Sequence, residues 1–150
     1  MSQANPIRIF VTHAWEPNDD YLRVFEYLES ARNFYYRNSS TPERRPMGDK
    51  EVIREDLRRQ IAPAEAVIGL ASLYERQHEL LVFQLTFAQA CNKPVILLKT
   101  FGLQRPVPKS LADLASETVD WDERALVDAV RRLARHEDTA RYDTIEFKLD

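Results

Sequence analysis

Short apolar runs alternate along this chain with segments whose apolar residues follow a helical period. The β-rich run Ile7–Thr12 predicts a first strand. The segment Tyr21–Ala31 places its apolar side chains on one helical face, and Asn18 or Asp19 can serve as its N-cap. The chain therefore opens as a strand followed by a helix.

A second strand and helix follow the same pattern. Residues 34–37, Phe-Tyr-Tyr-Arg, predict a short strand, and a long polar loop rich in turn residues comes after them. The next helix is predicted over 50–61, with Asp49 as its cap and Pro63 as its stop. Its apolar side is expected to consist of Val52, Ile53 and Leu57.

The run 66–71 is apolar throughout, which is typical of a central parallel strand covered on both faces. The alternation of strand and helix predicts a doubly wound α/β sandwich with a mainly parallel sheet of about five strands. For the tail 137–150 two alternatives stay open, an added edge strand or a loose segment. The remaining predicted elements are a helix over 77–91, a strand over 94–99, a short helix near Leu111, a weak strand over 117–121 and a helix over 123–134.

Length and charge narrow the class of protein. The 150 residues with 44% hydrophobic content suit one domain, 1–150, with its core at about 7–134. A net charge of −3 lacks the basic excess of a nucleic-acid-binding protein, so no nucleic-acid partner is expected. No apolar run is long enough to span a bilayer, and the start lacks a signal-peptide pattern, so no membrane partner and a cytoplasmic location are expected.

The lone cysteine, Cys91, has no second thiol with which to form a disulfide or a thiolate metal site. It is expected to be a small buried side chain at the end of the apolar helix. No metal site is predicted.

Ligands of open α/β sheets bind beyond the carboxyl ends of the strands, which here means the loops starting at His13, Asn38, Ala71 and Thr100. With three glycines in the chain and none after the first strand, no phosphate-cradling loop of the Walker or dinucleotide type is present. A phospho-receiver domain needs acidic residues just after the first strand and an Asp after the third, but these strands end in VTHAW and GLASLY.

Three residues at the ends of the first two strands are candidates from their chemistry alone. His13 can act as an acid or base near neutral pH, although a single histidine at a strand end is more often a packing residue. Arg37, followed by Asn38, can hold a phosphate or carboxylate bidentately, or form an ordinary surface ion pair. The pair beginning at Asp19 is interpreted as helix capping.

Three stretches together resemble a known family. Residues 8–42, RIFVTHAWEPNDDYLRVFEYLESARNFYYRNSSTP, are similar to the opening of the bacterial TIR-like family typified by ThsB, the TIR component of Thoeris anti-phage defence. Residues 61–108, from IAPAEAVIGLASLY through HELLVFQLTFAQACNKPVILLKTFGLQRPVP, resemble its third strand, Tyr-containing loop, catalytic helix and fourth strand. Residues 112–132, ADLASETVDWDERALVDAVRR, are similar to its closing segment.

This resemblance implies a flavodoxin-like TIR fold and an activity. Enzymatic members bind NAD+ as a substrate rather than as a tightly held cofactor, and cleave its nicotinamide–ribose bond. The product, a cyclic ADP-ribose isomer or an ADP-ribose conjugate, is read by a separate effector. TIR domains commonly assemble, so a homo-oligomer is expected.

The alignment puts Gln84 at the position of the family's catalytic glutamate. Breaking the N-glycosidic bond builds positive charge on the ribose, which a carboxylate stabilises and an amide does not. Glu79 should face elsewhere, about 140° around the helix from Gln84, and rescue by the loop residue Glu75 is not expected. NAD+ can still bind, but the chain as written is predicted to be impaired in cleavage.

Three interpretations of Gln84 stay open. The favoured one is an NAD+-consuming enzyme in which a glutamate was changed to glutamine. The second is a natural, catalytically silent TIR module that acts through self-association or protein partners, and the third is a satisfied core amide and a shifted alignment. The pocket residues predicted beside Gln84 are Thr12, His13, Trp15, Arg37, Asn38 and Tyr74. Trp15 can pack on a flat ring or simply cover the end of the sheet.

Overall fold

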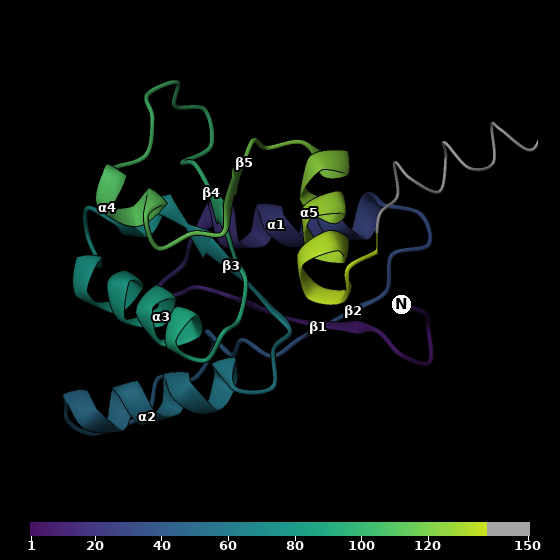
Figure 1. The fold of residues 1–150 in the computed structure, drawn as a ribbon. Coiled ribbons are helices and arrows are strands. Elements are labelled where there is room, and N and C mark those ends of the chain that lie inside the picture. The colour runs from purple at the N-terminus through teal and green to yellow at the C-terminus, as the bar shows by residue number, and fades with distance from the viewer. Residues whose placement is uncertain (138–150) are drawn as a thin grey trace, which may run out of the picture.

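The computed structural model describes residues 1–137, which form one three-layer α/β sandwich (Figure 1). Five parallel strands lie in the order β2-β1-β3-β4-β5, a flavodoxin-like arrangement. The strands are β1 (Ile7–Val11), β2 (Tyr36–Asn38), β3 (Ala66–Leu70), β4 (Val95–Leu98) and β5 (Glu117–Val119). The predicted fold class is confirmed, and the predicted tail 137–150 lies, beyond Glu137, outside the described residues.

Helices cover both faces of this sheet, as a fully apolar β3 requires. Helices α1 and α5 pack together on one face, and α2 and α3 pack together on the other (Figure 1). A 3₁₀ turn, η1, follows β3 at Ala71–Leu73. The helices are α1 (Asp19–Ser30), α2 (Lys50–Ile61), α3 (His78–Ala90), α4 (Lys109–Ala112) and α5 (Glu123–Arg135).

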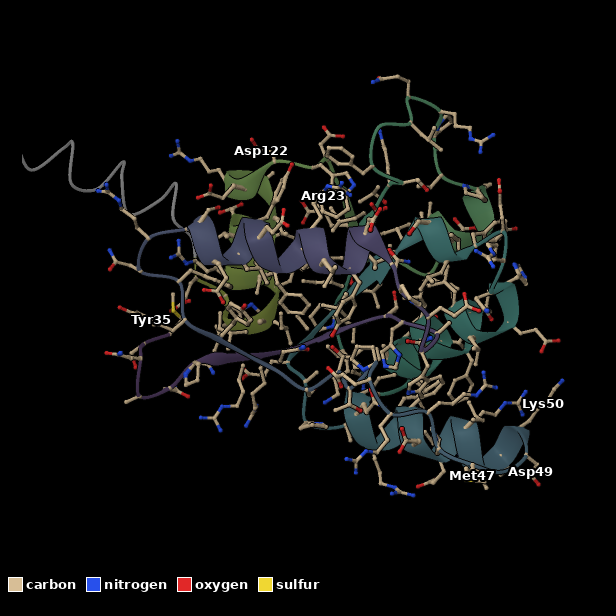
Figure 2. The ribbon with its side chains drawn as sticks, turned by 180° about the vertical axis from the view of Figure 1, so that it is seen from behind. Arg23, Tyr35, Met47, Asp49, Lys50 and Asp122 are labelled. Carbon is tan, nitrogen blue, oxygen red and sulfur yellow. The ribbon has the colours of Figure 1, made fainter. Side chains whose placement is uncertain are left out.

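The helix starts follow local side-chain chemistry. The side chain of Asn18 accepts a hydrogen bond from the backbone of Tyr21 at the start of α1. Asp49 caps α2 in the same way through two backbone N–H groups, and Figure 2 shows it beside Lys50 at that end of the helix. These caps satisfy N–H groups that a helix start leaves without partners.

Two predictions about side chains are wrong. Val52 is 41% exposed, because the inward face of α2 is made by Ile53 and Leu57 and continues to Gln60 and Ile61. Val52 precedes Ile53 by one residue, about 100° around the helix.

The second wrong prediction concerns Cys91, which is exposed rather than buried. Helix α3 ends at Ala90, and Cys91 is its C-cap. The chain then turns at Asn92, which has a φ of +58°, so the inward spacing of the helix does not continue to the thiol.

Helix α3 packs unusually closely on β3, at Gly69. A Cβ added at Gly69 would lie 2.9 Å from Cδ2 of Leu85. Only a residue without a side chain lets Leu85 pack this closely on the strand. The neighbour of Leu85, Gln84, is thereby held against the end of β1.

Candidate functional site

Gln84 is fully buried, and all of its recorded hydrogen bonds go to backbone groups. Its Oε1 accepts from the backbone N–H of His13 at 3.1 Å, and its Nε2 donates to the carbonyl of His13 at 2.9 Å. Nε2 also donates to the carbonyl of Leu80, one helical turn earlier, at 2.9 Å. The amide therefore brackets the loop after β1, and its polar atoms are satisfied as burial demands.

Thr12 is likewise buried and occupied. Its Oγ1 accepts from the backbone N–H of Leu70 at 2.9 Å, which ties the end of β1 to the end of β3. The threonine hydroxyl thus contributes to holding the sheet edge together where the loop begins.

The imidazole of His13 ends a chain of side-chain hydrogen bonds from α2. Gln60 Nε2 donates to Asp56 Oδ2 at 2.7 Å, which leaves Gln60 Oε1 as the acceptor 2.8 Å from His13 Nε2. The imidazole proton is therefore assigned to Nε2. Within residues 1–137, His13 Nδ1 is buried without a hydrogen-bond partner, so it presents an unused lone pair.

Trp15 packs edge-on against His13, with ring centroids 4.9 Å apart and planes at 87°. Its indole Nε1–H is buried and has no hydrogen-bond partner in the part of the chain that the structure describes. Its φ of +56° is in the left-handed region, which is a strained conformation for a bulky residue. A donor and an acceptor without partners thus occur on two rings in direct contact.

Asn38 belongs to a closed ring of hydrogen bonds at the end of β2. Its Nδ2 donates to the Tyr21 hydroxyl at 3.1 Å, Tyr21 bonds the Ser40 hydroxyl at 2.8 Å, and Ser40 donates back to Asn38 Oδ1. The aromatic ring of Tyr21 lies 6.4 Å, between centroids, from the imidazole of His13. The hydrogen-bonded group of Asn38, Tyr21 and Ser40 therefore borders the His13–Trp15 pair. Arg37 is exposed on the same short strand.

Tyr74 is separate from this group in its recorded contacts. Its ring packs against His78 at 4.7 Å, and it lines a pocket between the loops after β3 and β4. Glu75 in the same loop forms an exposed ion pair with Arg105, and Glu79 on α3 forms one with Lys50. Neither carboxylate therefore takes the place of an acid at position 84.

Sequence reasoning missed Gln60 and Tyr21 as parts of this site, and also Ser40. Gln60 stands at the inward spacing of α2, three residues after Leu57, and a polar residue at such a position was a usable signal. Ser40 lies in a loop whose path no periodicity predicts. The interpretation of the Asp19–Asp20 pair as helix capping is wrong, because Asn18 is the N-cap of α1. The carboxylate of Asp20 accepts instead from Arg23 and from the backbone N–H of Phe101.

Burial lowers the pKa of His13, and the hydrogen bond to Gln60 only partly opposes this effect. The neutral form is favoured in the folded state, so the unfolded chain binds more protons once the pH falls below about 6.5. The contribution of neutral His13 to the free energy of unfolding is therefore complete above that pH, and it is lost as the pH falls toward the lowered pKa of His13. Urea unfolding should therefore show a lower free energy of unfolding at pH 5.5 than at pH 7.5.

In His13→Gln that pH difference should shrink, because the variant lacks the imidazole that takes up the proton. The hydrogen bonds between the backbone of residue 13 and Gln84 do not involve the side chain of residue 13, so they are kept. An equal pH difference in the variant and the parent would assign the effect to other groups.

The described residues contain no helix that is both long and apolar enough to cross a membrane. What the fold and the site define is a parallel α/β domain with a polar cluster at the carboxyl ends of β1, β2 and β3.

Comparison with protein-family models gives no match, and comparison with curated protein sequences gives none either. A similar solved structure is that of a 3-dehydroquinate dehydratase-like protein from Bifidobacterium longum. It is 11% identical, with a TM-score of 0.44, over 89% of this chain and 96% of that one.

Proposed function

We propose that this chain is a TIR-like domain of bacterial anti-phage immunity and that it binds NAD+ beside His13 and Trp15. In this proposal the natural activity is cleavage of the nicotinamide–ribose bond, which produces an ADP-ribose-derived signal for a separate effector. The chain as written binds the substrate and is impaired in cleaving it.

The unused polar atoms of His13 and Trp15 are the observation that carries the proposal. A hydroxyl group can donate to the lone pair of His13 Nδ1 and accept from the indole N–H of Trp15. The ribose hydroxyls of NAD+ are such groups, and the flat indole can pack on one of its rings. Because both nitrogens are buried, Trp15 must move to admit the ligand, and its strained backbone lowers the cost of that movement.

The lack of a negative charge at position 84 supports impaired cleavage. The transition state carries positive charge on the ribose, and a carboxylate nearby would stabilise it where the neutral Gln84 does not. The acids nearest in the α3 segment, Glu75 and Glu79, are exposed and paired with cations. Binding depends on hydroxyl and ring contacts, so it does not require that charge.

A silent module is the second candidate, and the hydrogen bonds of Gln84 favour it. Its Nε2 donates to two carbonyl oxygens, which a carboxylate in the same position would repel. The hydrogen-bond surroundings of the amide are thus suited to glutamine itself. Under this candidate the domain acts through self-association or protein partners.

Calorimetric titration of NAD+ into the chain as written separates the two candidates. Saturable binding is expected, and Trp15→Phe should weaken it by roughly 2- to 10-fold, the worth of one hydrogen bond. Trp121→Phe is the matched control, because that indole N–H donates to the carbonyl of Lys99 instead. It should leave NAD+ affinity unchanged.

Absence of NAD+ binding, or equal affinity in the parent and Trp15→Phe, would contradict the proposed site. Sedimentation of the same samples with and without NAD+ then tests the second candidate. A homo-oligomer that forms without nucleotide would favour the silent module.

A further inference from the structure

The pocket that Tyr74 lines, apart from His13 and Trp15, lies between the loop after β3 and the loop after β4. It has a volume of about 350 Å³, within the range of small-molecule sites. The loop after β4 projects beyond the end of the sheet (Figure 1), and its residues Leu103 and 105–108 form much of the wall. Because the pocket is at the carboxyl ends of two parallel strands, it stands where open α/β sheets bind ligands.

Two cations line this pocket, and both have weakly held partners. Lys99 Nζ lies 3.6 Å from Asp120, whose side chain is 83% exposed. Arg105 lies 3.2 Å from Glu75, and both of those side chains are mostly exposed. Exposed ion pairs contribute little to stability, so an anionic ligand can replace the carboxylate partners of these cations at a small cost in free energy.

A buried hydroxyl adds a third donor to the same pocket. Ser72, in the turn directly after β3, lines the pocket, and its buried Oγ has no hydrogen-bond partner among residues 1–137. A buried hydroxyl without a partner is unfavourable, and an oxyanion oxygen would satisfy it once the side chain turns toward the pocket. The remaining wall is largely apolar and aromatic, from Tyr74, Leu103, Pro106, Val107 and Pro108.

From these residues we propose that the pocket binds a small phosphate monoester through Lys99, Arg105 and Ser72. Three donor groups match the three free oxygens of a phosphate monoester better than the two of a carboxylate. The apolar wall accommodates the organic part of the ligand. This inference does not depend on NAD+ or on position 84.

Phenyl phosphate is the probe, because it has a phosphate, an apolar ring and neither ribose nor nicotinamide. Calorimetric titration at pH 7.5 should give one saturable site, and affinity should fall as the salt concentration rises. Lys99→Ala and Arg105→Ala should each weaken binding by about 10-fold or more, as expected for a charge-assisted hydrogen bond. Ser72→Ala should weaken it by a smaller factor.

Lys50→Ala is the matched control, since Lys50 is an exposed lysine with an exposed glutamate partner outside this pocket. It should bind phenyl phosphate as the parent does. Thermal unfolding of each variant confirms that the fold is retained, which is expected because Lys99 and Arg105 are not part of the core.

The proposal is overturned by any of three outcomes: no saturable binding, unchanged affinity in both Lys99→Ala and Arg105→Ala, or benzoate binding as tightly as phenyl phosphate. The last outcome would make the site a carboxylate site. Inorganic phosphate, titrated separately, shows whether the anion alone is recognised or the apolar wall contributes.

Discussion

Gln84→Glu is expected to raise the rate of nicotinamide release from NAD+ by roughly 100- to 1000-fold, the effect of one preorganised electrostatic group. The carboxylate would stand where the resemblance to the TIR-like family puts the catalytic acid. Chromatography of the reaction measures the released nicotinamide, and the accompanying product peak identifies the signalling nucleotide.

The hydrogen bonds of Gln84 determine what this substitution costs. A glutamate keeps the acceptor that bonds the His13 N–H, but its second oxygen faces the carbonyls of His13 and Leu80. The loop after β1 must shift, or the carboxyl must bind a proton, so the variant should also be less stable than the parent. A shift of this loop would move Trp15 as well, which is the residue that must open for NAD+.

Gln89→Glu is the matched control, because Gln89 is on the same helix and exposed. It introduces the same charge without entering the site and should leave nicotinamide release at the parent level. If Gln84→Glu releases no more nicotinamide than Gln89→Glu, even with infected-cell extract as a source of activator, then position 84 is not the catalytic one.

Gln84→Leu is expected to lower the free energy of unfolding by about 2 to 5 kcal/mol. The leucine fills a similar space but leaves the buried N–H and C=O of His13 without their amide partner, and each such group costs about 1 to 3 kcal/mol. Urea unfolding monitored by circular dichroism measures the loss. His13 and Trp15 should also become more mobile, since the two hydrogen bonds between Gln84 and the backbone of His13 that hold their loop are removed.

The same substitution at the exposed position, Gln89→Leu, should change stability by no more than about 0.5 kcal/mol, as surface substitutions usually do. A loss below about 1 kcal/mol in Gln84→Leu would mean that the bracket contributes little to stability. In that case the amide would be better explained by a ligand than by the fold.

The sequence predicted most elements because their signals are local. The helix over 50–61 was predicted at its observed bounds, since Asp49 caps it and Pro63 follows it closely. The apolar run at 66–71 indicated a central strand by its composition alone, and the observed strand, Ala66–Leu70, is buried throughout. The errors at Val52 and Cys91 arose where the answer depends on how a helix is rotated or where it ends.

The candidate site was predicted in part. The alignment singled out Gln84, which stands among apolar residues of the predicted helix, and the structure buries it completely. Its partner, the backbone of His13, is 71 residues away along the chain. The bond between His13 and Gln60 spans 47 residues in the same way.

The sequence by itself determined the order of strands and helices, the parallel α/β class and the loops in which the polar residues lie, because periodicity, caps and turn residues act over a few positions. Only the tertiary structure decided which polar atoms are satisfied and which are left without partners. Those outcomes depend on packing between distant segments, such as the approach of α3 to β3 over Gly69. The bracket at Gln84 and the unused atoms of His13, Trp15 and Ser72 are products of that packing.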